Sequence, residues 1–494
     1  MLGTYFTFPE LLIWLPLVAG MVAFFMKNAQ AIKVWSLMAA VAVVAVSLTG
    51  LCYADASAYP TYNQVSYYWL KHLGNSFHLH LNKTGHLLSL LTALGFLFIF
   101  IYSWKEKRER SNSFYGLMLL AQAGIMGVFS AVDALVFYFF WELALIPVYF
   151  LCSMWGGEKR IQTTFKFFIY TFVGSLLMLT GILYVYYHTQ GRIFNDGTQA
   201  MHSFALNAFQ SANLTAAEQG CLFWLFLAAF GVKMPIFPLH TWQPGAYDQS
   251  PTPVTMVLSG IMVKMGLFGL LRWLLPVLPE ASSKYADIVI ALSIFGIIYA
   301  SLIALVQDNL KKLVAYSSIA HIGLMSAAIF AKNELSLNGA ILQMFNHGIN
   351  IIGLWIIIGI IERKTGTKKI SELGGLAIKA PALTVFMIVI ALANIALPLT
   401  NAFVGEFMMF SGLFEYSKWM TAIAGLGIIL AAAYTLNMIR NVFYGAASVS
   451  VSEVSDIELH EKLVLSLIVL IVLATGVYPQ PIIEFISNLS ATTM

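Results

Sequence analysis

The sequence predicts an all-α integral membrane protein with about fourteen transmembrane helices. Of its 494 residues, 59% are hydrophobic and only 10% are Asp, Glu, Lys or Arg, whereas a soluble domain has about 25% charged residues. So few charges cannot cover the apolar mass with a hydrated surface, and lipid must therefore surround most of the chain. The apolar residues also gather in runs of about 20, the length that one spanning helix needs.

We expect a single polytopic membrane domain over residues 1–494. It would contain three peripheral helices (1–112), a first repeat (113–276), a second repeat (285–445) and a terminal helix (460–494). No cleavable signal is expected, because the first basic residue is Lys27 and the first helix has no positive leader. The expected spans are 7–25, 32–51, 85–104, 113–131, 133–155, 162–188, 219–239, 252–276, 285–306, 310–331, 336–361, 380–416, 418–444 and 463–487.

Lysine and arginine are distributed unequally between the two sets of expected loops. Eighteen of the 27 lie in loops that join an odd-numbered span to the next even-numbered span, and seven lie in the other loops. Because cytoplasmic loops of membrane proteins are enriched in Lys and Arg, we expect both termini on the outer, periplasmic side. The remaining two, Lys233 and Lys264, fall inside apolar runs.

The composition gives no sign of a bound cofactor or of a nucleic-acid partner. Cys52, Cys152 and Cys221 are far apart and lack the spacing of iron–sulfur or zinc ligands. The net charge of +4 is too small for a nucleic-acid surface. His78 and His80 alternate, which is more typical of the hydrated face of a short strand than of a metal site. We expect no metal or cofactor site in this chain.

Six ionisable residues lie well inside apolar runs, where a charge costs at least about 2.5 kcal/mol. The structural alternatives are a carboxyl held protonated, a lysine whose amine reaches the interface, and a hydrogen-bonded core histidine. All six, however, can gain or lose a proton when a neighbouring charge changes. We predict a line of proton-transferring residues formed by Glu142, Lys233, Lys264, His321, His347 and Glu406.

Proline interrupts two of the apolar runs close to these residues. Pro235 and Pro238 follow Lys233, and Pro398 precedes Glu406. Inside lipid, a broken helix is tolerated only where protein or a wet cavity satisfies the freed backbone groups. The broken runs are the seventh and the twelfth, so helices 4–8 and 9–13 can form two five-helix units of opposite direction. Inverted repeats with broken helices at the ion site are typical of secondary transporters.

Four stretches of the sequence carry a family resemblance: FWELALIPVYFL, GVKMPIFPLHTWQPGAYDQSPTP, SGIMVKMGLFGLLR and KKLVAYSSIAHIG. They resemble the antiporter-like subunits shared by complex I, the multisubunit sodium/proton antiporters and some membrane-bound hydrogenases. The resemblance implies a fourteen-helix subunit with inverted repeats and a central line of protonatable residues. The chain departs from the family pattern at Gly245 and Tyr247 and in LPLTNAFVGEF, so no role is carried over to those loops.

Within the family, Glu406 favours the M-type subunits of complex I. These subunits resemble the chain in having glutamate here, whereas the L and N types and the antiporter's D protein usually have lysine. The chain also ends after the fourteenth expected helix, without the long lateral helix of the L type. The alternatives are a subunit of a sodium/proton antiporter and a subunit of a hydrogenase- or formate-linked pump. A structural scaffold would leave the six buried ionisable groups without a role.

The M-type resemblance implies a translocase subunit of a proton-pumping NADH:quinone oxidoreductase in a bacterial inner membrane. Its partners would be other membrane subunits, including L and N types, and flavin, iron–sulfur clusters and quinone would lie on other subunits. In the expected mechanism, Glu142 pairs with Lys233 until a neighbouring subunit draws Glu142 away. Lys233 then passes its proton to Lys264, and the proton continues through His321 or His347 to Glu406 and the outside.

Overall fold

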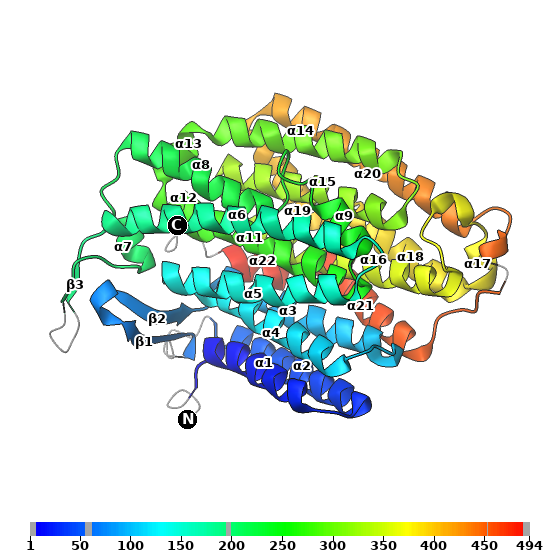
Figure 1. The fold of residues 1–494 in the computed structure, drawn as a ribbon. Coiled ribbons are helices and arrows are strands. Elements are labelled where there is room, and N and C mark those ends of the chain that lie inside the picture. The colour runs from blue at the N-terminus through cyan, green and yellow to red at the C-terminus, as the bar shows by residue number, and fades with distance from the viewer. Residues whose placement is uncertain (1–5, 55–61, 194–198, 452, 488–494) are drawn as a thin grey trace.

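Long helices with roughly aligned axes make up most of the molecule (Figure 1). The computed structural model describes residues 6–54, 62–193, 199–451 and 453–487. In these residues, 12 helices are long and apolar enough to cross a membrane. Helices satisfy their own backbone groups, so they are the form that such runs adopt in lipid. The predicted all-α membrane class is confirmed, while the count of fourteen and the inverted repeats stay predictions.

Eleven of these helices are continuous α-helices. Several begin at an Asn or Asp whose side chain accepts backbone N–H groups of the first turn, as at Asn28, Asn82 and Asp133. The eleven are α1 (Phe8–Phe25), α2 (Ala29–Cys52), α3 (Lys83–Tyr102), α4 (Ser111–Ser130), α5 (Ala134–Trp155), α6 (Arg160–Tyr187), α14 (Ala286–Leu305), α15 (Leu310–Ala331), α16 (Glu334–Thr365), α20 (Lys418–Phe443) and α21 (Leu459–Val477).

The twelfth apolar helix, Thr252–Val277, changes its winding along its length. Two π-helical segments, η5 (Val257–Met262) and η6 (Leu270–Leu274), alternate with α10 (Thr252–Met256), α11 (Val263–Gly269) and α12 (Leu275–Val277). The sequence predicted one plain helix over 252–276. Its hydropathy does not reveal π segments, which are rare and occur mostly at functional sites.

The two runs predicted to be broken are interrupted in the structure. In the first, α8 (Ala216–Lys233) ends at the predicted lysine, and α9 (Gln243–Gln249) begins ten residues later. In the second, α18 (Pro381–Asn394) and α19 (Asn401–Tyr416) flank a turn in which Ala396 and Leu399 have positive φ. The predicted span 219–239 therefore stops short at Lys233, because Pro235 cannot supply a helical N–H.

The prediction of one terminal helix over 463–487 is wrong, because this stretch holds parts of two helices. The structure divides it into α21, which ends at Val477, and α22 (Gln480–Ser487). Pro479 lies between them, and the residue before a proline is disfavoured in the helical conformation. Only α21 is long enough to span a membrane.

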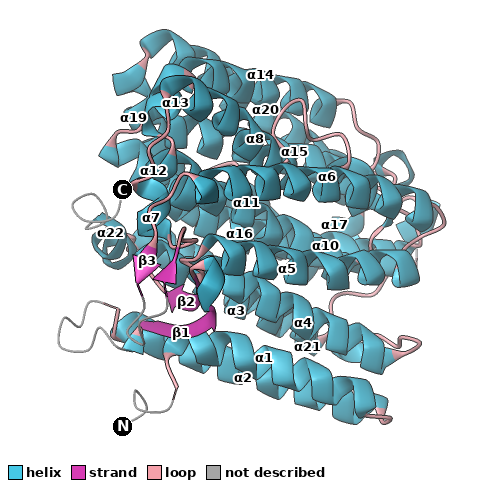
Figure 2. Cartoon of the chain, turned by 60° about the vertical axis from the view of Figure 1, so that its left-hand side comes forward, coloured by secondary structure: helices cyan, strands magenta, loops and turns pink. Residues whose placement is uncertain are grey.

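Short elements occupy the two ends of the helices. The hairpin of β1 (Gln64–Leu70) and β2 (Asn75–His80), the pair β3 (Arg192–Ile193) and β4 (Gln199–Ala200), and α7 (Leu206–Gln210) lie at one end, which we call the hairpin end (Figure 2). The strand predicted around His78 and His80 is confirmed as β2. Also present are α13 (Pro279–Lys284), α17 (Leu376–Lys379), η3 (Lys71–Leu73), η4 (Ser103–Lys105), η7 (Ile370–Glu372) and η8 (Val449–Val451).

The loops predicted to be rich in basic residues meet at the opposite end, which we call the basic end. Three ion pairs join segments that are far apart in the sequence there: Lys311 Nζ–Glu362 Oε2 at 2.7 Å, Lys368 Nζ–Asp248 Oδ1 at 2.6 Å, and Lys105 Nζ–Glu458 Oε2 at 2.6 Å. These pairs gather the loops of one predicted side into a single surface.

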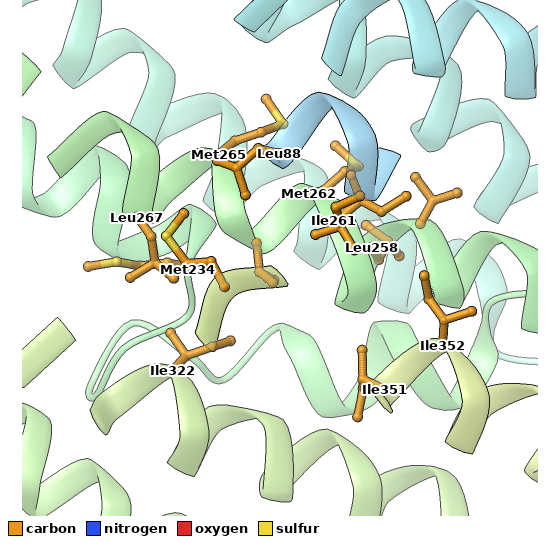
Figure 3. Packing of buried hydrophobic residues seen from close by; sticks show 14 of the residues in the cluster. Leu88, Met234, Leu258, Ile261, Met262, Met265, Leu267, Ile322, Ile351 and Ile352 are labelled. Carbon is orange, nitrogen blue, oxygen red and sulfur yellow. The ribbon is translucent and has the colours of Figure 1, made fainter. Parts of the chain in front are cut away.

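Close apolar packing surrounds the helix Thr252–Val277, which we call the composite helix (Figure 3). Leu258 and Met265 on this helix, Ile352 on α16 and Met234 just after α8 are among the buried side chains of this region. Glycine allows α11 to approach α8 closely, because a Cβ on Gly266 would lie 2.7 Å from Phe230 O. Water is thereby excluded from most of this region, which makes the polar groups within it few and specific.

Candidate functional site

Lys264 lies on α11 between the two π-helical segments and is fully buried. Its Nζ donates to the carbonyl oxygen of Ser259 at 3.0 Å and lies 2.9 Å from His347 Nδ1. A buried lysine needs such partners, because burial of an unpaired ammonium is costly. The ammonium therefore makes direct contact with a second predicted site residue on another helix.

His347, on α16, connects Lys264 with α15. Its Nε2 lies 3.3 Å from Ser318 Oγ. Because Lys264 donates to Nδ1, we assign the proton of a neutral His347 to Nε2, which donates to Ser318. The ring centroids of His347 and His321 are 5.5 Å apart, so the two imidazoles are direct neighbours.

His321, on α15, contacts Glu406 on α19. Nδ1 of His321 lies 3.1 Å from Glu406 Oε1, and both side chains are buried. Gln343 Nε2 donates to the same carboxylate oxygen at 3.3 Å, and Asn394 Nδ2 lies 3.4 Å from His321 Nε2. These amides fix the orientation of the histidine and the carboxylate.

Four of the six predicted residues thus follow one another in the spatial order Lys264, His347, His321 and Glu406, with hydrogen-bond contacts at the two ends and a ring contact between the histidines. The sequence left open which histidine connects lysine to glutamate. In the structure the two histidines lie in series between them.

Glu142 and Lys233 lie apart from this line. Lys233 is buried with its Nζ 5.3 Å from the centroid of the Trp141 ring, and this nitrogen has no hydrogen-bond partner. Glu142 is half-buried on α5, and its Oε1 also has no partner. Within the described part of the chain no hydrogen bond or ion pair within 4.0 Å joins them, although the two groups are close enough for their charges to interact, so their pairing stays a prediction. The contact that Lys233 does make is aromatic.

Sequence reasoning missed the polar residues that surround the line. Ser317 accepts from Tyr434 OH at 2.8 Å and from Asn394 Nδ2 at 3.4 Å. On α16, Gln343, Asn346, His347 and Asn350 are all buried. Their spacing of three and four residues places them along one helix face, so a polar stripe in this apolar run was the signal that could have found them.

No group of three or more His, Cys, Asp or Glu side chains in the described residues is arranged to hold a metal ion. The three cysteines, all described, are free. What the geometry offers is a set of proton donors and acceptors inside an apolar environment.

Comparison with known proteins agrees with these features. The family model described as NADH:quinone oxidoreductase/Mrp antiporter, TM, matches residues 131–431. NADH-quinone oxidoreductase subunit M of Rickettsia typhi is 36% identical over 434 residues, 87% of this chain and 85% of the relative. F(420)H(2) dehydrogenase subunit M of Methanosarcina mazei is 35% identical over 491 residues, 97% of this chain and 96% of the relative.

A solved structure of respiratory complex I from Thermus thermophilus with bound NADH contains a similar chain. The TM-score is 0.86 at 27% sequence identity, and the match covers 97% of this chain and 99% of that one. The matched family model covers more than half of the sequence, and the predicted site residues Glu142, Lys233, Lys264, His321, His347 and Glu406 lie inside its range. The chain therefore belongs to the NADH:quinone oxidoreductase/Mrp antiporter family of membrane subunits, in which these sequence relatives are M-type subunits.

Proposed function

We infer that this chain is the M-type membrane subunit of a respiratory NADH:quinone oxidoreductase and that it translocates protons. Family membership and the subunit M relatives support the assignment. The chain contributes to a translocase whose electron transfer takes place on other subunits. Flavin, iron–sulfur clusters and quinone accordingly belong to those subunits, and neighbouring L- and N-type membrane subunits are its partners.

One observation carries the role in proton transfer: the line from Lys264 through His347 and His321 to Glu406. A protonated Lys264 hands a proton to His347 Nδ1, and His347 releases its Nε2 proton toward Ser318 and His321. His321 then gives its Nδ1 proton to Glu406. Histidine suits the middle positions because its affinity for a proton is closest to neutrality.

Glu142 and Lys233 form the control point ahead of this line. When Glu142 approaches Lys233 the ammonium is retained, and when a neighbouring subunit draws Glu142 away the proton leaves for Lys264. The described arrangement, with Lys233 over Trp141 and no hydrogen bond between Lys233 and Glu142, resembles the second state. Moving a charge against 200 mV costs about 4.6 kcal/mol, at about 2.3 kcal/mol per 100 mV. Breaking a buried pair involves about 3–5 kcal/mol, so the pair is strong enough to act as the gate.

We place the basic end on the cytoplasmic side and both termini on the outer side. Eighteen of the 27 Lys and Arg residues support this orientation. Glu406 then delivers the proton toward the hairpin end. From Glu406, α19 continues to Tyr416, and the start of α16 lies beside this last part of α19, where Asn333 Nδ2 donates to Gly412 O at 2.6 Å.

The test is the Glu406→Gln variant in the native host, with Glu415→Gln as the matched control on the same helix. Glu415 is exposed, whereas Glu406 is buried. Proton uptake and NADH:quinone reductase activity are measured together in inverted membrane vesicles. We expect Glu406→Gln to lose at least about tenfold in both, a typical effect of removing a proton-transfer group, with the complex assembled and the control unaffected.

The other outcomes separate the alternatives. If NADH-driven uptake survives in Glu406→Gln while sodium/proton exchange disappears, the chain is an antiporter subunit. If wild-type vesicles pump with a reduced deazaflavin donor and not with NADH, the electron-input module is of the type named for the Methanosarcina mazei relative. Normal pumping by Glu406→Gln with either donor contradicts the proposed line.

A further inference from the structure

Two cavities at the hairpin end meet at one arginine. The first has a volume of about 620 Å³ and is mainly apolar, with Phe268, Leu271, Leu275, Leu337 and Ile341 in its wall. It lies among the start of α3, the end of the composite helix and the start of α16. Its position at one end of the spanning helices places it at the level of a membrane surface.

The second cavity, of about 610 Å³, is polar. Gln64, His78, His80, Gln190 and Asn207 are among its lining residues. Gln210, Arg272 and Pro276 line both cavities, so the two are adjacent. Together they form one binding space with an apolar part and a polar part, joined at Arg272.

Arg272 has no anionic partner among the described residues. Its Nε is buried and makes no hydrogen bond to the described part of the chain, in which no ion pair includes it either. Arginine cannot shed its charge at physiological pH, and an unpaired charge at a low-dielectric site is costly. A second cation, Lys332, lines the apolar cavity and donates to Ser283 at 3.0 Å. Glu334, the acid in that wall, has an interaction of its own.

The positive charge of Arg272 acts on a side chain that lines the polar cavity. Burial, followed by the nearby Arg272 guanidinium, lowers the pKa of His80 to about 4. His80 is therefore neutral at physiological pH and adds no positive charge of its own. The binding space is positive at its centre, apolar on one side, and neutral and hydrogen-bonding on the other.

We propose that a phospholipid binds here, with its phosphate on Arg272, an acyl chain in the apolar cavity and its polar headgroup against β2. The guanidinium fork matches the oxygens of a phosphate. A free phosphate ion would leave the apolar cavity without an occupant, whereas an amphiphile fills both parts. Lys332 at the wall of the apolar cavity adds to the attraction for an anionic lipid.

The experiment uses the intact complex from cells grown with radioactive phosphate. Leu275→p-benzoylphenylalanine places a photoreactive group in the apolar wall, and illumination followed by gel electrophoresis measures the radioactive lipid attached to this chain. Wild-type Arg272 should give strong labelling. Arg272→Gln should lower it at least about tenfold, as loss of a charge-assisted hydrogen bond predicts, and Arg272→Lys should lower it less. Lys284→Gln, a cation at the same end outside both cavities, should leave it unchanged.

A second variant keeps the proposal testable if Arg272→Gln does not assemble. Leu337→Trp fills the apolar cavity without removing the arginine, and it should also abolish labelling. Equal labelling in Arg272→Gln, or undiminished labelling in Leu337→Trp, overturns the proposal. Photocrosslinking to another subunit instead of lipid overturns it too, because the occupant is then a polypeptide. Loss of labelling on adding inorganic phosphate assigns the site to the free ion.

Discussion

Lys233 and Lys264 are both buried lysines, yet their surroundings give them different roles. Lys264 has a carbonyl and a histidine within hydrogen-bond distance, so it is held in the line. Lys233 has an aromatic face and no hydrogen-bond partner, so its charge depends on what approaches it. This difference supports the assignment of Lys233 to the gate and Lys264 to the conducting line.

Lys233→Arg tests the gate. Arginine keeps the positive charge and the contact with Trp141, but it cannot release its proton. We expect an assembled complex whose NADH-driven proton uptake is at least about tenfold lower in inverted vesicles. Lys418→Arg, at the exposed start of α20, should behave as wild type. Normal uptake by Lys233→Arg would show that Lys233 does not have to give up a proton.

The six candidate site residues could be chosen from the sequence, whereas their contacts could not be predicted from it. A charge in an apolar run is visible in the sequence itself, and all six candidates were selected in this way. The series order of His347 and His321 depends on how α15 and α16 pack, which no local pattern encodes. The contact of Lys233 with the Trp141 ring was likewise not predictable, because the sequence shows Trp141 only as one more aromatic residue.

Among the elements, the breaks near Lys233 and Glu406 were predictable, whereas the break at Pro479 was not predicted and the changes of winding could not be. Proline lies just beyond the ends of α8 and α21 and in the turn before α19, where it weakens the helix because it lacks a backbone N–H, although α5 continues through Pro147. Nothing comparable marks η5 and η6, since no residue type is required for a π turn. These segments lie on either side of Lys264, so the part of the helix closest to the site was the least predictable.

Gly266→Ala tests the packing of α11 on α8. A Cβ there would lie 2.7 Å from Phe230 O and 2.9 Å from Met234 N, and backbone atoms cannot move aside cheaply. We expect overpacking of about 1–3 kcal/mol, measured as a lower Tm of the purified complex, together with weaker proton uptake, because α11 carries Lys264. Gly425→Ala on α20 meets nothing within 4 Å and should leave both unchanged. Equal Tm values for the two variants would contradict this packing.

At the scale of the whole molecule, Asp248 connects loops of the basic end that are far apart in the sequence. Burial alone would raise the pKa of this carboxyl, but the Lys368 ammonium and the Asn309 amide lower it overall. A lowered pKa means that the ionised form stabilises the folded state at any pH above the unfolded value, and that this stability is lost only as the pH falls through the folded value.

Asp248→Asn should therefore lower the Tm of the complex at pH 7, since Lys368 loses its partner at 2.6 Å. The difference from wild type should stay constant between about pH 7 and pH 5, because an ordinary aspartate titrates near 3.9 and this one lower. Glu372→Gln removes an exposed partner of Lys369 and should have little effect. A difference that already shrinks at pH 6 would mean that the carboxyl is not ionised as described.

Orientation is the property of the whole molecule that the sequence addresses most directly and that helix packing alone cannot reveal. The packing of the helices is the same in either orientation in the membrane, whereas the excess of Lys and Arg at one end distinguishes the cytoplasmic side from the outer side. In a chain whose three cysteines are replaced by serine, Glu372→Cys reports on the basic end and Leu73→Cys on the hairpin end; both positions are exposed. A membrane-impermeant maleimide should label Glu372→Cys in inverted vesicles and Leu73→Cys in right-side-out vesicles. The reverse pattern would place the basic end outside, and Glu406 would then deliver protons inward.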